Sequence, residues 1–437
     1  MSTICAISTP AGIGGIAVIR ISGPKAITLT DKLFRGRKSL AETRSYSMRF
    51  GEIVAADEVL DQVLCSVFRA PHSFTGEEMV EISCHGSPYV QQAIIQALLD
   101  AGCSMAAPGE FTRRAFLNGK MDLTEAEAVA DLIAAESKAE KDLALAHLKG
   151  GVSNELKALR EQLLRLTSLI ELELDFADHE ELEFADRGEL KELSERIDGK
   201  LTSLIHSFRL GNAVKNGIPV AIVGPTNAGK STLLNALLGE EKAIVSDIPG
   251  TTRDIIEDTL IINGLLFRFI DTAGLRDTED EIEAIGIRRA HAAAEKAEII
   301  LYVTEGEEPR IFEGKVIWVR NKSDKYCYPK PKDDTTICLC AKHDSLEPLK
   351  QKIYEIAGVD VNRRNMAATI SSARHYEALV RARDAIQRVQ AGLRDGLSGE
   401  FLSMDLQDCL TAIGEITGEI TNDEVLGTIF SKFCIGK

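Results

Sequence analysis

Three short runs in the middle of the chain have the residue types and the order of a nucleotide site. The run GPTNAGKS occupies residues 224–231, DTAG occupies 271–274 and NKSD occupies 321–324. Each of them follows an apolar stretch of the kind that forms a buried strand. In this order, the three runs predict a protein that binds and hydrolyses GTP.

The first run has the spacing of a phosphate-binding loop, G-x4-G-K-S. An apolar stretch at 218–223 precedes it and the helix-like STLLNALL follows it, which is the context this loop requires. The glycines let backbone N–H groups turn toward phosphates, and the N-terminus of the helix adds its dipole. Lys230 supplies a positive charge, and the hydroxyl of Ser231 is a ligand for Mg²⁺.

The second run is expected to sense the terminal phosphate. Asp271 ends the apolar stretch 265–270 and would hold Mg²⁺ through water, while the N–H of Gly274 would meet the γ-phosphate. The run GTTRD at 250–254 lies between the first two motifs, and a threonine in it can close over Mg²⁺ as a switch loop does. The alternative for GTTRD is an ordinary polar turn.

The third run selects the base. The carboxylate of Asp324 can accept hydrogen bonds from N1–H and from the 2-amino group of guanine. Adenine offers neither donor, so rejection of ATP could reach about 10⁴-fold. Cys340-Ala341-Lys342 follows a further strand-like stretch, and the N–H of Ala341 would contact the guanine oxygen. GTPases usually have Ser-Ala here, so Cys340 is a tolerable departure.

The residue that orients the attacking water is not evident from chemistry. Ras-like enzymes have a glutamine just after D-x-x-G, but this chain has Leu275, which cannot orient water. Carboxylates that could take this role follow closely and leave the choice open: Asp277, Glu279, Asp280, Glu281 and Glu283.

The elements that must position these groups fall into three regions. Residues 1–118 mix strand-like runs at 15–21, 61–68 and 79–84 with a helix-like run at 89–100, which indicates a small α/β or α+β domain. Residues 123–208 and 362–437 have helical periodicity, whereas 215–361 alternates strands, glycine turns and helices.

These regions predict a multidomain α/β protein. An N-terminal α/β domain would occupy 1–118, and a helical bundle would be built from 119–214 and 362–437. A Ras-like P-loop G domain at 215–361 would be inserted into that bundle. The alternative is three domains in a simple row.

Size and composition fit a cytoplasmic protein. The chain has 437 residues, of which 44% are hydrophobic and 27% charged. No apolar run approaches the roughly 20 residues that span a bilayer, and the N-terminus lacks the features of a secretory signal. The nine cysteines are scattered, and Cys338-x-Cys340 is a poor zinc motif, so reduced thiols in the cytoplasm are expected.

The charge is unevenly distributed. The net charge of −16 argues against broad non-specific binding of nucleic acid. Residues 171–198 contain twelve acidic and three basic residues, so they account for nine of the sixteen net negative charges. We interpret this stretch as a solvated helical face. The rest of the chain is only mildly acidic, which leaves room for a basic patch elsewhere.

The whole chain resembles the MnmE (TrmE) family of tRNA modification GTPases. The resemblance is carried by GGIAVIRISG at 14–23, SFTGEEMVEISCHG at 73–86 and PGEFTRRAFLNGKMDLTEAEAVADLI at 108–133, together with IVSDIPGTTRD, DTAGLR and the terminal FCIGK. It implies an N-terminal domain that binds tetrahydrofolate and forms a homodimer, and a helical domain split by a G domain.

The resemblance also implies an activity. With the flavoprotein MnmG, in a heterotetramer, the chain would add an aminomethyl or carboxymethylaminomethyl group to C5 of the wobble uridine of certain tRNAs. The implied cofactors are GTP, Mg²⁺, K⁺ and either 5,10-methylenetetrahydrofolate or 5-formyltetrahydrofolate, with FAD on the partner only. Two other classes stay open from the motifs alone: a GTP-switched binding module without tRNA chemistry, and a ribosome-assembly or signalling GTPase.

The resemblance assigns a GTP site to residues of the three motifs and of the loop between the first two. These are Asn227, Ala228, Gly229, Lys230, Ser231, Thr232, Ser246, Asp247, Ile248, Pro249, Gly250, Thr251, Thr252, Asp271, Thr272, Ala273, Gly274, Asn321, Lys322, Asp324, Cys340, Ala341 and Lys342. Within this set, Ser231 and Thr252 match the Mg²⁺ ligands. Asn227 matches a K⁺ ligand, with Ser246, Ile248 and Thr251 around the ion, and Glu283 matches the glutamate that orients water.

A second set of residues matches the folate site. Arg20, Glu81 and Lys120 match folate-contacting positions, and Lys437 is a weaker match. A carboxylate can pair with the aminopyrimidine edge of a pterin, and cations suit the glutamate tail of a folate. Cys434 would take part in the modification chemistry near this site. Two departures from the family pattern, Thr226 and Ser87, are not expected to touch a ligand through their side chains.

Cys434 stands at the fourth position from the end, where a prenylation motif would place its cysteine. Gly436 is not aliphatic and Lys437 is not a favoured terminal residue, so prenylation is not expected. A free thiol in the tail is the other alternative to the catalytic role.

Overall fold

A computed structural model describes most of the chain: residues 2–175, 187–239, 258–270, 291–306, 312–326, 328, 333–359, 366–421, 423–431 and 433–436. The chain divides into two compact units. The first contains Met1–Ala130, Leu148–Lys157 and Leu410–Lys437, and the second contains Asp131–His147 and Ala158–Cys409.

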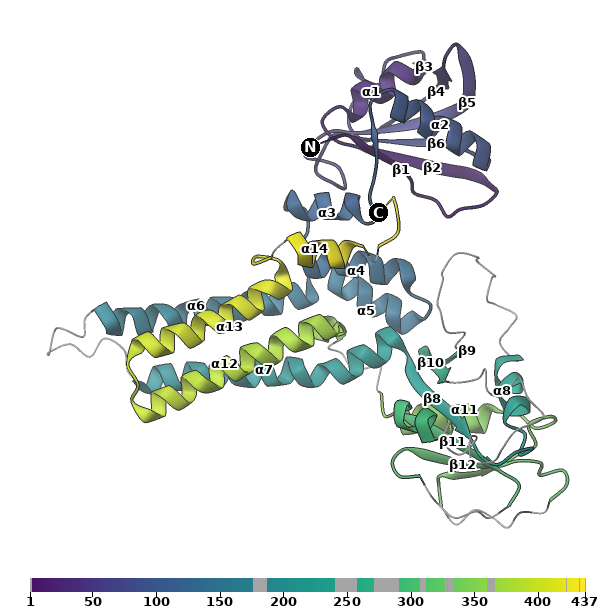
Figure 1. Ribbon diagram of the computed structural model, residues 1–437, viewed down its shortest axis with the longest axis vertical. Coiled ribbons are helices and arrows are strands. Elements are labelled where there is room, and N and C mark those ends of the chain that lie inside the picture. Colours follow the sequence, from purple (N-terminus) through teal and green to yellow (C-terminus); the bar gives the residue numbers. More distant parts are fainter. Residues whose placement is uncertain are drawn as a thin grey trace. The chain divides into compact units, whose positions relative to one another are not determined.

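The first unit is built on a seven-stranded sheet in the order β3-β4-β5-β6-β2-β1-β7 (Figure 1). All neighbouring strands are antiparallel except β1 and β7. The strands are β1 (Ile4–Ile7), β2 (Gly14–Ser22), β3 (Phe34–Gly36), β4 (Ser47–Ala55), β5 (Glu58–Phe68), β6 (Met79–Gly86) and β7 (Ser104–Met105).

Two helices, α1 (Ala26–Leu33) and α2 (Pro88–Asp100), cover one face of this sheet (Figure 1). Apolar residues alternate along β2 and β6, so Ile19, Ile21 and Ile82 point to the same side and pack with Ile94 and Leu98 of α2. The predicted strands at 15–21, 61–68 and 79–84 and the predicted helix at 89–100 are confirmed, each extended by zero to three residues at an end.

Helices dominate the regions where helical periodicity predicts them. They are α3 (Glu110–Leu117), α4 (Leu123–Ala134), α5 (Lys138–Leu148), α6 (Gly151–Asp175), α7 (Arg187–Asn216), α12 (Ala373–Asp395), α13 (Gly399–Thr417) and α14 (Asp423–Phe430). None of the helices in the described ranges is long and apolar enough to cross a membrane.

Helix α7 lies against α12, although some 150 residues of chain separate them (Figure 1). The rings of Phe208 and Tyr376 stack with their centroids 4.6 Å apart. The backbone N–H of Ile370 donates to the hydroxyl of Ser207 over 3.0 Å. The helical segments that flank the nucleotide motifs therefore pack against each other within the second unit.

The second unit also contains a six-stranded sheet in the order β13-β12-β11-β8-β10-β9. Its strands are β8 (Ile218–Val223), β9 (Asp258–Ile262), β10 (Leu265–Ile270), β11 (Ile299–Thr304), β12 (Val316–Arg320) and β13 (Thr336–Cys338), with helices α8 (Lys230–Gly239) and α11 (Glu347–Ala357). All neighbouring strands are parallel except β9 and β10.

Strand β8 lies between β10 and β11, so the strand order reverses at β8. In such open parallel sheets, ligands bind outside the carboxyl ends of the strands at this point. The phosphate loop follows β8, NKSD follows β12 and Cys340 follows β13. The fold therefore brings these three sequence motifs to one edge of the sheet.

Candidate functional site

The phosphate loop links β8 to α8 and has an unusual backbone. Gly224, Asn227 and Gly229 have φ angles of +143°, +64° and +93°. A Cβ on Gly224 would lie 2.0 Å from the carbonyl oxygen of Val303, and one on Gly229 would lie 2.3 Å from Nδ2 of Asn321. Both glycines are therefore required by the close approach of neighbouring groups as well as by their backbone angles.

Lys230 begins α8 and folds back over its own loop. Its Nζ donates to the carbonyl oxygens of Gly224 (2.9 Å) and Pro225 (2.7 Å). Burial lowers the pKa of Lys230 because the charged form loses solvation. An anionic phosphate in the loop would replace these contacts to neutral carbonyls with an ion pair to Lys230.

Asn321 joins the motifs to one another. It is 2% exposed, its Nδ2 donates to the carbonyl oxygen of Ala228 (2.9 Å), and its Oδ1 accepts from the N–H of Ala341 (3.0 Å). The sequence motif assigns Asn321 to the nucleotide but does not reveal this bracing role. Because the side chain is buried with both ends paired, it holds the phosphate loop and the 340–342 loop at a fixed separation.

The N–H of Ala341 is the group predicted to contact the guanine oxygen. In the structure it donates to Asn321, so a guanine oxygen would compete with that amide for the same hydrogen. Asp324 lies exposed at the same edge, and a hydrogen bond from the thiol of Cys340 lowers its pKa. The lowered pKa favours the carboxylate, which is the form that accepts hydrogen bonds.

Lys322 reaches from the 321–324 loop to the phosphate loop. Its Nζ donates to the carbonyl oxygen of Asn227 over 2.8 Å and pairs with the carboxylate of Glu305. The side-chain amide of Asn227 makes no hydrogen bond to any residue in the described ranges. No described residue therefore competes with a ligand for its oxygen.

Several predicted site residues lie outside the described residues. These are Ser246, Asp247, Ile248, Pro249, Gly250, Thr251, Thr252, Asp271, Thr272, Ala273, Gly274, Glu283 and Lys437. Ser231 and Thr232 lie in the first turn of α8, and Lys342 is exposed beside Ala341.

A second candidate site lies in the first unit, on strands β2 and β6. The register pairs Arg20 with Glu81, and the Nη2 and Nε atoms of Arg20 lie 2.8 and 2.9 Å from Oε1 of Glu81. Both contacts use Oε1, so Oε2 accepts no hydrogen bond from the described part of the chain. The guanidinium also lies 5.4 and 5.7 Å from the ring centroids of Phe74 and Phe111.

The C-terminal tail reaches this pair of residues. Nη1 of Arg20 and the hydroxyl of Ser8 both donate to the carbonyl oxygen of Gly436, over 3.3 and 3.1 Å. Gly436 has φ +92°, and a Cβ there would lie 2.4 Å from the carbonyl oxygen of Ile7. The carbonyl oxygen of Cys434 accepts a hydrogen bond from the N–H of Gly109, and Cys434 is exposed.

The structure therefore brings Arg20, Glu81 and the tail that carries Cys434 together. Lys120 is held separately. Its Nζ donates to the carbonyl oxygen of Pro71 over 3.1 Å, and its aliphatic stem lies beside Gly76. Within the described ranges, no hydrogen bond or ion pair joins Lys120 to Arg20 or Glu81.

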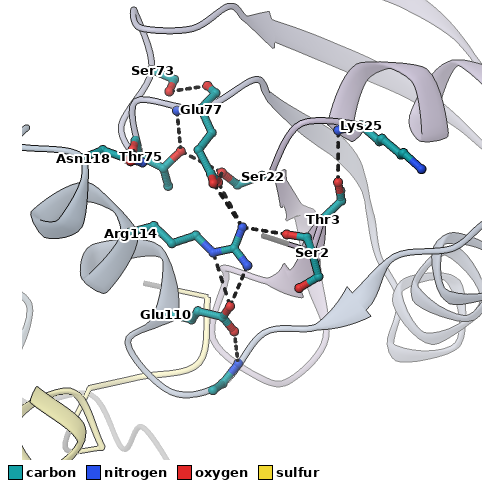
Figure 2. Close-up of polar contacts among 11 residues, drawn as sticks. Ser2, Thr3, Ser22, Lys25, Ser73, Thr75, Glu77, Glu110, Arg114 and Asn118 are labelled. Atoms are coloured by element: carbon teal, nitrogen blue, oxygen red, sulfur yellow. Dashed lines mark hydrogen bonds and ion pairs between the residues drawn. The ribbon is translucent and has the colours of Figure 1, made fainter. Parts of the chain in front are cut away.

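Arg114 forms the centre of a polar network beside this site (Figure 2). Its side chain is 6% exposed and pairs with Glu77 (Nη1–Oε2, 3.1 Å) and with Glu110 (Nη2–Oε1, 2.7 Å). Nη1 also donates to the carbonyl oxygen of Ser2 over 2.8 Å, and the hydroxyl of Ser22 donates to Glu77. The network ties the end of β2 to the start of α3, next to Gly109.

The geometry of the second unit defines a P-loop nucleotide-binding protein of the GTPase class. Models of protein families match nearly the whole chain: the MnmE helical domain matches residues 123–434, and the GTP-binding protein TrmE N-terminus matches residues 3–120. The chain belongs to the MnmE (TrmE) family.

Full-length relatives agree with this assignment. The chain is 52% identical to the tRNA modification GTPase MnmE of Parabacteroides distasonis, with 100% of both chains covered. It is 48% identical to the protein of that name from Bacteroides thetaiotaomicron, over 100% of this chain and 99% of the relative. For that of Porphyromonas gingivalis the identity is 50%, over 100% and 98%.

Proposed function

We propose that this chain is a GTP hydrolase that acts in tRNA modification. With a flavoprotein partner, MnmG, it would add an aminomethyl or carboxymethylaminomethyl group to C5 of the wobble uridine of certain tRNAs, using a one-carbon tetrahydrofolate. The observation that carries the proposal is that Asn321 joins the phosphate loop to the 340–342 loop through two hydrogen bonds. Relatives named tRNA modification GTPases, matched over their whole length, support the rest.

GTP would lie along the carboxyl edge of the sheet. Backbone N–H groups of 227–232 and the ammonium of Lys230 would hold the phosphates, and Asp324 would accept from guanine. Ser231 and Thr252 would hold Mg²⁺, with Asp271 acting through water. The ion would neutralise charge on the phosphate oxygens. A hydroxyl at the N-terminus of α8 suits a hard cation of this kind.

Potassium would assist hydrolysis between paired G domains. The side-chain amide of Asn227, which bonds to no described residue, supports a role as a K⁺ ligand, and Ser246, Ile248 and Thr251 would complete the site. The cation would stabilise the charge that an arginine finger stabilises in other GTPases. Glu283 would orient the attacking water.

Turnover of GTP should therefore be at least about tenfold faster in KCl than in NaCl at equal ionic strength, because an arginine finger contributes about 10³–10⁵-fold. Glu283→Ala should keep nucleotide affinity and lose about 10²-fold or more in turnover. Phosphate release measures turnover in both experiments, and titration with a fluorescent GTP analogue measures the affinity of Glu283→Ala. Equal rates in the two salts would remove Asn227 from an ion site, and retained turnover in Glu283→Ala would point to the neighbouring carboxylates.

A tetrahydrofolate would bind beside Arg20 and the tail. The open Oε2 of Glu81 would accept from the aminopyrimidine edge of the pterin while Oε1 stays paired with Arg20. Lys120 and Lys437 would suit the glutamate tail of the folate. Cys434, exposed on the docked tail, would take part in the modification chemistry as a thiolate.

Replacing Glu81 by Gln should weaken binding of 5-formyltetrahydrofolate about ten- to hundredfold, because a hydrogen bond to a charged group is lost. Calorimetric titration measures the affinity. Glu78→Gln is the matched control, since Glu78 also faces an arginine, Arg69, at 3.6 Å. Unchanged affinity in the double variant Arg20→Ala, Glu81→Ala would rule out this pocket.

We also propose a homodimer through the N-terminal domains, in the cytoplasm. Ile13, Ile16 and Tyr89 are 92%, 71% and 76% exposed and lie toward the end of the β2–β6 pair where Gly14 faces Gly86. An apolar surface of this kind fits a second copy of the chain. A monomer in sedimentation equilibrium would refute the dimer.

Every cysteine that the structure describes is a free thiol, which fits a reducing compartment such as the cytoplasm.

A further inference from the structure

One edge of the N-terminal sheet is strongly basic in a chain whose net charge is −16. The segment from residue 32 to residue 49 contains six basic residues and one acidic residue, Glu42. Five of the basic side chains are exposed, and no hydrogen bond or ion pair joins them to another described residue: Lys32, Arg35, Arg37, Lys38 and Arg44. These cations are available to an external partner.

The segment runs from the end of α1 through β3, the terminal strand of the sheet, and along the loop that enters β4. Prevention of edge-to-edge aggregation is sufficient to explain a charged residue on an edge strand. That explanation covers Arg35 on β3. It does not cover the cations of the loop that follows, which forms no strand.

The loop is held in a fixed conformation by its neighbours. Oδ1 of Asp31 accepts from the N–H of Leu40 over 2.6 Å. Arg69 donates to the carbonyl oxygens of Ala41 (2.6 Å) and Thr43 (3.1 Å). Because the backbone is already ordered, binding a partner here would cost little additional conformational entropy.

An aromatic side chain stands at the end of this loop. Tyr46 is 71% exposed and has φ +58°, a conformation that non-glycine residues rarely adopt. Its N–H donates to the carbonyl oxygen of Val67 (2.8 Å), and its ring meets Phe68 edge-on at 5.9 Å. Strained residues of this kind concentrate at functional sites, and an exposed aromatic face can stack on a nucleic acid base.

We propose that this basic edge, residues 32–49, is a contact surface for RNA. The cations bind phosphates, and Tyr46 stacks on an unpaired base. Repulsion from the acidic remainder of the chain directs a polyanion to this edge. The proposal rests on the proposed function in taking tRNA as the RNA.

The test measures binding of purified tRNA to the full-length protein by fluorescence anisotropy over a range of salt concentrations. The triple variant Arg35→Gln, Arg37→Gln, Lys38→Gln should bind at least about tenfold more weakly. The slope of log affinity against log salt concentration should become less negative by about two to three, because each lost phosphate contact reduces the slope by about one. Thermal unfolding checks that the variant is folded.

A matched control removes the same charge elsewhere. Lys141, Lys157 and Arg165 are 50%, 55% and 68% exposed, and their joint replacement by Gln should leave tRNA affinity within about twofold. Tyr46→Phe should bind as wild type does. Tyr46→Asn, which suits the left-handed backbone but cannot stack, should bind about tenfold more weakly.

Three outcomes would overturn the proposal: wild-type affinity in the triple variant, an equal loss in the control, or a loss explained by a changed oligomeric state in sedimentation. The last would assign the edge to contacts between protein chains. Wild-type protein that binds no tRNA would instead count against the proposed function itself, and this inference would fall with it.

Discussion

Replacing Asp324 by Asn should change the preferred nucleotide from GTP to xanthosine triphosphate. The carboxylate can accept from both N1–H and the 2-amino group of guanine, whereas an amide would place its own N–H₂ against one of these donors. Xanthine has an oxygen at position 2 and can accept from that amide. We expect GTP affinity to fall by up to about 10⁴-fold while the xanthine nucleotide gains, because a hydrogen-bonding site rejects a mismatched partner strongly.

The structure supports the choice of this residue. A hydrogen bond from the thiol of Cys340 lowers the pKa of Asp324, which favours the carboxylate form that can accept from two donors. Competition titration of the two nucleotides against a fluorescent analogue measures the preference. Asp334→Asn makes the same chemical change before β13, at the opposite edge of the sheet and at a side chain that is 94% exposed, and should have no effect. An unaltered preference for GTP in Asp324→Asn would refute the assignment.

Arg114→Gln should destabilise the N-terminal sheet by about 3–5 kcal/mol in its free energy of unfolding. The side chains of Glu77 and Glu110 are only 12% and 23% exposed, and both lose their cation in the variant. Removing one partner from a buried ion network leaves uncompensated charge, which is the costly case. Native-state hydrogen exchange of amides in β2 and β6 measures the change.

Two further variants separate charge from packing in this network. Adding Glu77→Gln and Glu110→Gln to Arg114→Gln should recover much of the lost stability, since no carboxylate is then left unpaired. Arg388 also contacts two carboxylates, those of Asp405 and Asp408, but it is 51% exposed, so Arg388→Gln should cost no more than about 1 kcal/mol. If Arg114→Gln lowered the free energy of unfolding no more than Arg388→Gln does, the stabilising role of the Arg114 network would be contradicted.

Local patterns in the sequence predict the strand and the loop that form the edge of the second sheet at the candidate nucleotide site. A wholly apolar run before a glycine-rich loop requires a buried parallel strand, and the structure has β8 there with the loop at its carboxyl end. The brace made by Asn321 depends on the distance between two loops that are about 110 residues apart in sequence. No local pattern contains that distance.

The N-terminal site shows a different limit. Arg20 and Glu81 lie in strands that the sequence predicts, yet their pairing depends on the strand register. The contact of Arg20 with Gly436 joins opposite ends of the chain, which periodicity cannot reveal. Arg114 is a charged residue in a polar run and would be expected at the surface. The spacing of Glu110 and Arg114, four residues apart on one helix, is the only local signal of their pairing.

The sequence does not predict strand β4, which pairs with β5 along its whole length. Its apolar residues Met48 and Phe50 are exposed, at 55% and 64%, so its first half lacks the buried apolar pattern of an interior strand. The preceding residue Tyr46 has a left-handed backbone, although the sequence has no glycine, asparagine or aspartate there to indicate one. Both features depend on tertiary pairing with β5.

The proposed tRNA modification is tested by analysing the nucleosides of tRNA after reaction with the purified chain, GTP, a one-carbon tetrahydrofolate and the flavoprotein partner. Wobble uridines should carry an aminomethyl-type group at C5 in the complete mixture, and none should do so when this chain or GTP is left out. Unmodified uridine in the complete mixture, or equal modification without GTP, would contradict the proposal.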